Sequence, residues 1–156
     1  METVYLETRF ISYLVSHPSR DLLVAAHQQT THEWWINRRQ DFECYVSQVV
    51  IDEATAGDPK EAKKRMERIS AFPVLEVTDE ADFFSRSILE SGAIPPHSVR
   101  DAAHIAVVAV NDVDYLLTWN CTHLANAQII RRISVIGNKE GYNMPVICTP
   151  EELMGG

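Results

Sequence analysis

Four polar residues stand at positions where their side chains could do chemistry together. Three are carboxylates and one is an amide: Glu7, Glu53, Asp101 and Asn120. Each follows closely on an expected strand end or opens a buried helix, and in open α/β sheets ligands gather at the carboxyl ends of strands. Carboxylates that converge there repel one another unless a counterion joins them, and Mg²⁺ or Mn²⁺ is the natural choice. The pattern therefore predicts a divalent-metal site able to activate water for phosphodiester cleavage, with Glu7, Glu53 and Asp101 as metal ligands.

Two of these acids also have a structural interpretation, which the sequence alone leaves open. Ser98 and Asp101 are spaced as in a capping box, where the third helical residue reaches back to the cap. Glu7 directly precedes a helical pattern, where an acid gains from the helix dipole. Glu53 lies beside the inward face of its expected helix, whereas its neighbour Asp52 points to a different side. Only the contacts of these acids with residues from elsewhere in the chain can decide whether each is a helix cap or a metal ligand.

The elements that must position these residues alternate along the chain. Short apolar runs predict strands at 3–7, 42–46, 73–77, 114–118 and 145–148. Between them lie helical patterns at 10–17, 20–41, 48–56, 59–71, 79–92, 98–110 and 127–132, with a last short helix capped by Thr149. The segment 102–110 is nearly all small or apolar, as expected of a buried helix. The alternation predicts an α/β fold, a three-layer α/β/α arrangement around a central mostly parallel sheet, in one domain spanning 1–156.

The composition narrows the class of protein. Hydrophobic residues make up 46% of the 156 residues and charged residues 23%, as in soluble globular proteins. No apolar run approaches the ~20 residues of a membrane span, and the start lacks a signal pattern, so we expect a cytoplasmic protein without membrane contact. The net charge of −8 argues against coating nucleic acid by electrostatics alone, but it permits an enzyme that acts on nucleic acid. Three cysteines without a CxxC pair suit reduced, mostly structural thiols.

Basic residues and tryptophans offer further candidates for contacts. The basic groups are Arg38–Arg39, the segment 60–68 and Arg131–Arg132, each interpreted first as a solvated helix face. Within 60–68, Glu61 and Arg65 have the spacing of a helical ion pair. Trp34 and Trp35 are adjacent, so on a helix they point about 100° apart and one is expected to be partly exposed. Core packing or a subunit contact explains them better than base stacking.

Four stretches of the chain carry a resemblance to a known family. They read VYLET near the start, SQVVIDEA in the middle, then RDAAHIAVVAV and LLTWNCTHLANA. In this order they resemble the PIN-domain ribonucleases, and specifically the VapC-type toxins of bacterial toxin–antitoxin pairs. The resemblance implies a PIN-like fold, an acidic Mg²⁺ or Mn²⁺ site and cleavage of single-stranded RNA. It also implies a cognate antitoxin protein and, together with the tryptophans, a homodimer.

The resemblance assigns roles by position and also shows two departures. Glu7 stands where the family usually has its first aspartate, Glu53 matches the internal glutamate and Asp101 the aspartate at a helix start. Asn120 takes the place of a fourth, commonly acidic residue, and Thr118 that of a small hydroxyl residue. The longer Glu7 and the neutral Asn120 leave a second hypothesis open, a catalytically degenerate PIN-like scaffold that binds RNA or protein. His104 is interpreted first as a satisfied helix histidine, with a contact to the site residues or to the substrate as the alternative. His123 has no assigned role.

Overall fold

The computed structural model describes residues 1–155 and is built around a five-stranded sheet in which all the paired strands are parallel. The strand order is β3-β2-β1-β4-β5. The strands are β1 (Thr3–Leu6), β2 (Glu43–Ser47), β3 (Val74–Leu75), β4 (Tyr115–Leu117) and β5 (Val146–Cys148). β1 is central and pairs with β2 on one side and β4 on the other. The carboxyl ends of these three strands therefore lie side by side.

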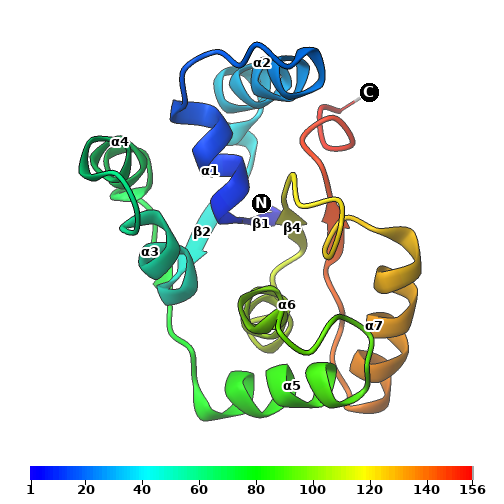
Figure 1. Cartoon of the computed structure of the whole chain (residues 1–156). Helices are drawn as coiled ribbons and strands as arrows, with labels where there is room; N and C mark the ends of the chain where they lie inside the picture. The colour runs from blue at the N-terminus through cyan, green and yellow to red at the C-terminus, as the bar shows by residue number, and fades with distance from the viewer. Residues whose placement is uncertain (156) are drawn as a thin grey trace.

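Helices cover the sheet on both faces, which confirms the three-layer α/β/α arrangement. They are α1 (Thr8–Val15), α2 (Leu22–Asn37), α3 (Gln48–Ala54), α4 (Pro59–Ile69), α5 (Asp79–Glu90), α6 (Val99–Val110) and α7 (Ala127–Lys139), with a short 3₁₀ turn at Arg39–Asp41. In Figure 1, α1 and α2 lie above the sheet and α5 and α6 lie below it. Within residues 1–155, none of the helices has the length and apolar character that a membrane crossing requires.

The core sits where the sequence is most apolar. Val4, Tyr5 and Leu6 of β1 are completely buried, because a central parallel strand is covered on both faces. On α6, Ala102 and Ala106 are also completely buried, and this helix packs most extensively against α5. The buried strand β1 and the buried helix α6 carry Glu7 at the end of the strand and Asp101 at the start of the helix.

Two predicted helix caps form as expected. The Ser47 hydroxyl accepts hydrogen bonds from the Val49 and Val50 amides at the start of α3. The Thr78 hydroxyl accepts from the Ala81 amide at the start of α5. Such caps satisfy amide groups that the helix itself leaves without partners. The α3 cap fixes where the helix that carries Glu53 begins.

Two helix predictions near the C-terminus are wrong. α7 continues to Lys139 instead of ending at Arg132, and its Gly137 packs against Met144. A Cβ atom at position 137 would lie 2.1 Å from the Met144 sulfur, so any larger residue would require the Met144 side chain to move. The segment after Thr149 forms turns rather than a helix, with the Glu152 and Leu153 amides donating to the Thr149 and Pro150 carbonyls three residues before them.

The tryptophan pair also differs from its prediction, since both rings are buried. Trp34 is completely buried and Trp35 is 7% exposed. The Trp34 indole N–H donates to the Leu153 carbonyl at 3.2 Å, and the Arg39 guanidinium lies 4.2 Å from the centre of a Trp35 ring. Neither ring offers a free surface, because the C-terminal segment and a basic side chain cover them. Of the two interpretations of this pair, core packing fits.

Candidate functional site

The structure brings Glu7, Glu53, Asp101 and Asn120 to one cleft of about 400 Å³. Glu7 follows β1 directly, and Asn120 follows the end of β4, the neighbouring strand. Glu53 lies on α3, which begins where β2 ends, and Asp101 lies in the first turn of α6. The other residues lining the cleft are Thr8, Arg9, Ser12, Tyr13 and Arg100. The chemical roles of the four residues remain predictions, but their meeting at one edge is a property of the fold.

Glu7 is a buried carboxylate held by two neutral donors. The residue is only 5% exposed. Its Oε1 atom accepts from the Thr118 hydroxyl at 2.6 Å, and its Oε2 atom accepts from the Arg9 amide at 3.1 Å. Glu7 thus caps α1, as one interpretation of the sequence held, and it faces the cleft as well. Neutral donors stabilise a carboxylate without cancelling its charge, so Glu7 can still attract a cation.

Glu53 is held by two side chains from different elements. Its Oε1 atom accepts from the Thr8 hydroxyl at 2.8 Å and lies 2.6 Å from His104 Nε2. His104 is 1% exposed and belongs to α6, one turn after Asp101. The same nitrogen lies 3.9 Å from Glu7 Oε2. His104 is therefore a satisfied histidine, as expected, but the acid that it contacts is one of the candidate ligands.

The contact between His104 and Glu53 changes the pKa values of both groups. Burial alone would lower the pKa of His104, but the bond to Glu53 and the charges of Glu7, Glu53 and Asp101 outweigh burial and raise it. Burial would raise the pKa of Glu53, but the hydrogen bond and charge of His104, with Thr8 and Arg100, outweigh it and lower that pKa. Both shifts favour the charged forms of this pair.

Asp101 contacts the loop after β4 rather than its own helix end. Its Oδ1 atom accepts from the Asn120 side-chain amide at 3.1 Å, and its Oδ2 atom lies 3.0 Å from His123 Nδ1. Ser98 makes no side-chain cap at this helix, so the capping-box interpretation of Asp101 is wrong. The Asn120 side-chain oxygen, Oδ1, accepts from the His123 backbone amide at 3.1 Å, and the Thr118 hydroxyl accepts from the Asn120 backbone amide at 2.8 Å. Thr118 thus connects Asn120 to Glu7.

The donor set suits a hard divalent cation. Glu7, Glu53 and His104 each offer one ligand atom, and these three atoms lie within 4.8 Å of one another. Asp101 lines the same cleft but is not one of this trio. Oxygen ligands from carboxylates are typical of Mg²⁺ and Mn²⁺ sites. His104 lies 3.9 Å from the Glu7 carboxylate but contacts Glu53 more closely, at 2.6 Å. The sequence reasoning named His104 but did not identify Glu53 as its partner, because a histidine on an apolar helix carries no signal for the acid opposite it.

Two arginines, Arg9 and Arg100, line the cleft. No ion pair joins Arg9 or Arg100 to a carboxylate within residues 1–155, and both are exposed. In contrast, Arg65 donates to the Ala54 and Ala56 carbonyls, so the expected pairing with Glu61 is wrong; Lys64 makes it instead. Arg9 and Arg100 therefore add positive charge to a cleft that is also lined by three carboxylates.

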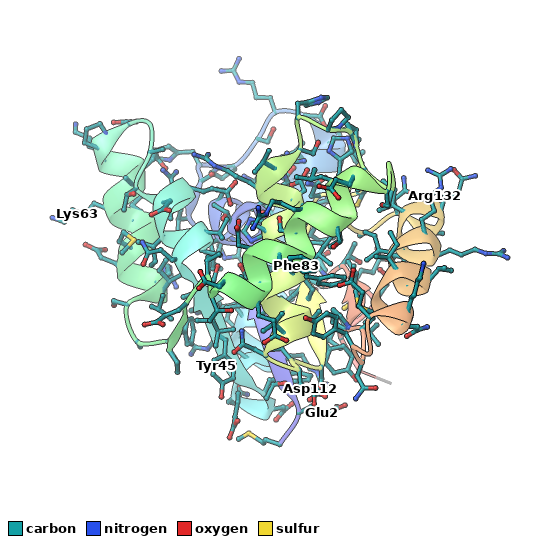
Figure 2. The ribbon with its side chains drawn as sticks, turned by 90° about the horizontal axis from the view of Figure 1, so that it is seen from below. Glu2, Tyr45, Lys63, Phe83, Asp112 and Arg132 are labelled. Carbon is teal, nitrogen blue, oxygen red and sulfur yellow. The ribbon has the colours of Figure 1, made fainter. Side chains whose placement is uncertain are left out.

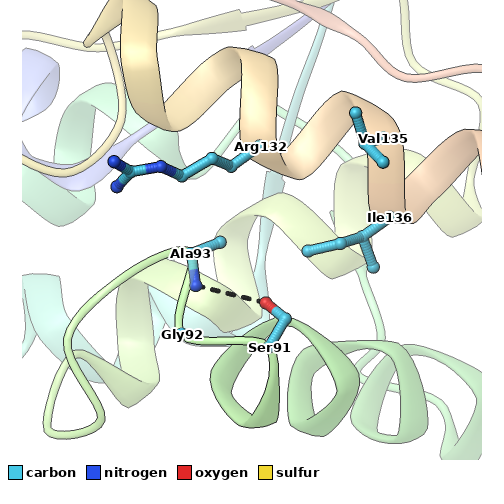
Figure 3. A pocket seen from close by; sticks show the side chains of 6 residues that line it. All are labelled: Ser91, Gly92, Ala93, Arg132, Val135 and Ile136. Carbon is cyan, nitrogen blue, oxygen red and sulfur yellow. Dashed lines mark hydrogen bonds between the residues drawn. The ribbon is translucent and has the colours of Figure 1, made fainter.

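Another hollow, of about 380 Å³, lies between the end of α5 and α7 (Figure 3). It is lined by Ser91, Gly92, Ala93, Arg132, Val135 and Ile136. The Ser91 hydroxyl, its most polar group besides Arg132, already accepts from the Ala93 amide at 3.2 Å. Without a carboxylate or a histidine in its lining, this hollow offers no comparable chemistry. The acidic cleft is the candidate site.

Comparisons with known proteins identify the fold but not a sequence family. No protein-family model matches the chain, and no curated protein matches it. Among solved structures, it is similar to VapC20 of Mycobacterium tuberculosis, a Sarcin-Ricin loop cleaving toxin, with a TM-score of 0.61 and 15% identity over 90% of this chain and 96% of that one. It is also similar to VapBC2 from Rickettsia felis, solved with a DNA fragment from its promoter, with a TM-score of 0.60 and 10% identity over 94% and 98% of the two chains. The PIN-like fold expected from the sequence is thereby confirmed.

Proposed function

We propose that this chain is a VapC-type toxin of the PIN-domain family, a metal-dependent endoribonuclease that forms one half of a type II toxin–antitoxin system. The observation that carries the proposal is the cleft at the carboxyl edge of the sheet, where Glu7, Glu53 and Asp101 converge with Asn120. The fold shared with two VapC proteins supports it, since one of them is a toxin that cleaves the Sarcin-Ricin loop. Residues 1–156 form a single PIN-like domain in this proposal.

Glu7, Glu53 and Asp101 would hold the Mg²⁺ or Mn²⁺ ion, and Asn120 would contact a phosphate oxygen or a water. Such an ion, when bound, lowers the pKa of water and stabilises charge on a phosphodiester. The chain's own contribution is to hold these groups in place. Thr118 fixes Glu7, Thr8 and His104 fix Glu53, and Asn120 fixes Asp101. Three carboxylates carry a formal charge of −3, which suits one divalent ion better than two.

Arg9 and Arg100 supply the attraction that an RNA strand needs on a chain with a net charge of −8. Each lies in the first turn of its helix, α1 or α6, and both line the cleft. A cation is unfavourable near a helix N-terminus, where the macrodipole favours anions. Two arginines at such positions, with no carboxylate partner, are explained by an anionic ligand. We assign them to phosphates on either side of the one that is cleaved.

The proposed partners follow from the same charges. A cognate antitoxin would cover the cleft and insert a basic side chain, because an arginine pairs with clustered carboxylates through two parallel hydrogen bonds. The protein would act in the cytoplasm as a homodimer. The burial of Trp34 and Trp35 removes them as dimer contacts, so the dimer would use other surfaces. Light scattering at micromolar concentration tests it, and a monomeric mass would contradict it.

The direct test of the proposed function is cleavage of labelled single-stranded RNA with Mg²⁺ or Mn²⁺ and with EDTA. We expect cleavage with either metal, none with EDTA and none by the Glu53→Gln variant, which removes a charge but keeps the side-chain length. RNA binding without cleavage under every metal condition would favour the degenerate scaffold. If the protein neither binds nor cleaves RNA, both the nuclease and the RNA-binding form of the scaffold are contradicted. The Glu53→Gln control also excludes a contaminating nuclease as the source of activity.

A further inference from the structure

A row of buried hydrogen bonds leads from the core to Glu53. The Tyr5 hydroxyl lies 2.7 Å from Ser47 Oγ and 2.6 Å from His104 Nδ1, and His104 Nε2 lies 2.6 Å from Glu53 Oε1. Tyr5 and Ser47 are completely buried and His104 is 1% exposed. These residues come from β1, β2 and α6, three separate elements. The row therefore ties the position of one cleft carboxylate to the centre of the molecule.

The donors in this row can be assigned by counting hydrogens. Ser47 Oγ accepts from two backbone amides at 3.1 and 3.4 Å, which leaves its own hydrogen to donate. The Tyr5 oxygen is its available acceptor, and Tyr5 then donates to His104 Nδ1. When His104 is neutral, its hydrogen is therefore on Nε2 and is donated to Glu53; the charged form keeps the same hydrogen on Nε2, so the bond to Glu53 is present in both states. If Tyr5 donated to Ser47 instead, the Ser47 hydroxyl hydrogen would have no acceptor within residues 1–155. Buried polar groups without a hydrogen-bond partner are rare in native proteins.

We propose that Tyr5 and Ser47 are positioning residues that hold His104 so that its Nε2–H fixes one oxygen of Glu53. The Oε1 atom then accepts from His104 and Thr8, and the Oε2 atom is free to bind the cation. Ser47 acts twice, because it also caps α3, the helix that carries Glu53. One hydroxyl thus sets both the start of the helix and, through Tyr5 and His104, the orientation of its carboxylate. This inference rests on the proposed function in treating Glu53 as a metal ligand.

Binding of Mn²⁺ alone to the metal-free protein tests the inference without any RNA. The Tyr5→Phe variant removes one hydroxyl and keeps the ring that meets the His104 ring edge-on at 5.7 Å. We expect it to weaken Mn²⁺ binding by roughly tenfold, the usual effect of losing a group that orients a ligand. The matched control is Tyr115→Phe, because the Tyr115 hydroxyl contacts only the exposed Glu2. That variant should bind Mn²⁺ like the wild type.

A double-mutant cycle separates positioning from mere stability. If Tyr5 acts through His104, the Tyr5→Phe change should have no further effect on Mn²⁺ affinity in a His104→Ala background. His104→Gln should bind Mn²⁺ more tightly than His104→Ala, because the glutamine amide can still donate to Glu53. If His104→Ala does not fold, the cycle is run in the His104→Gln background, where the Tyr5→Phe effect should shrink.

Each outcome of these titrations decides the inference. Equal Mn²⁺ affinity in Tyr5→Phe and Tyr115→Phe would overturn it and leave the proposed nuclease function standing. A full Tyr5→Phe effect in the absence of His104 would overturn it as well, since Tyr5 would then act by another route. Failure of Glu53→Gln to reduce the affinity of a metal-binding wild type would overturn both. The predicted pattern, a loss with Tyr5→Phe that vanishes without His104, would establish the positioning role.

Discussion

The two sides of the cleft hold their acids in different ways. On the core side, Glu7 and Glu53 are fixed around His104, whose partner Tyr5 belongs to the central strand. On the loop side, Asp101 is fixed by Asn120 and His123, both from the segment that follows β4. The side chains of His104 and Glu7 are 1% and 6% exposed, whereas that of Glu53 is 22% exposed, close to the 25% and 19% of His123 and Asp101.

This difference teaches which contacts set the geometry and which adjust to a ligand. On the core side, Glu7 and His104 are buried among strands and helices, and Glu53, although partly exposed, is held by His104 and Thr8. These carboxylates are therefore positioned by buried contacts before any ion arrives. The loop side is held by an amide and a histidine near solvent, where hydrogen bonds exchange with water at little cost. We therefore expect changes on the core side to have the larger effects on metal binding and catalysis.

The largest effect is expected from Glu53→Gln on the core side. The variant should lose RNA cleavage by at least about a hundredfold, because a ligand charge disappears where the surroundings cannot replace it. The matched control is Asp52→Asn, the neighbouring exposed acid, whose carboxylate contacts Gln48 on the same helix. The measurement is the initial rate of cleavage of labelled RNA at saturating Mg²⁺. Comparable losses in the two variants would remove Glu53 from the site.

A smaller effect is expected from Asp101→Asn on the loop side. Cleavage should fall by about tenfold to a hundredfold, since an asparagine can still offer one oxygen. The free energy of unfolding should change by less than about 1 kcal/mol, because Asp101 does not act as a cap. Urea denaturation measures the second quantity, and Asp112→Asn is the control, an exposed acid with a positive φ of 54° that asparagine tolerates. Unchanged cleavage with lower stability would restore a purely structural role for Asp101.

The sequence predicted the core side better than the loop side for a physical reason. Glu7 and Glu53 follow two strands that can be recognised from their apolar runs. Because these strands are parallel neighbours, the sheet alone brings the two glutamates to the same edge. The partner of Asp101 depends on the path of the loop after β4, which local patterns do not determine. His104 was missed as a partner of Glu53 because its contact crosses from α6 to α3. The extension of α7 past Arg132 was also missed; within it Gly137 packs against Met144, a contact that local patterns do not determine.

Arg9→Gln and Arg100→Gln should have moderate effects that do not distinguish the two sides. Each variant should weaken binding of single-stranded RNA, measured in EDTA so that no cleavage occurs. Each should also reduce the slope of log affinity against log salt by about 0.7 to 1, the contribution of one phosphate contact. The control is Arg132→Gln, an exposed arginine that extends outward from α7 (Figure 2). An equal loss in Arg132→Gln would mean that only net charge matters.

The smallest effect concerns the pH dependence of stability in the metal-free protein. The pKa of His104 in the folded protein is raised above its ordinary value of 6.5. Its contribution to the free energy of unfolding is therefore complete below pH 6.5 and is lost as the pH rises through the folded-state pKa. The pKa of Glu53 is lowered below its ordinary 4.5, so its contribution is complete above that pH and is lost as pH falls. Stability from the core side should therefore be greatest between these two values and decline toward alkaline pH. Urea denaturation at several pH values tests this, and His104→Gln should remove the alkaline decline.

The most direct test of the account is a crystal structure of the protein grown with Mn²⁺, with the ion located by its anomalous scattering. We predict one strong peak in the cleft, bound by Glu7 and by the Oε2 atom of Glu53, and reached by Asp101 directly or through water. Glu53 Oε1 should still accept from His104 in that structure. A peak at a different place, or a cleft that stays without Mn²⁺ at millimolar concentration while Glu7, Glu53 and Asp101 keep their present partners, would contradict the account.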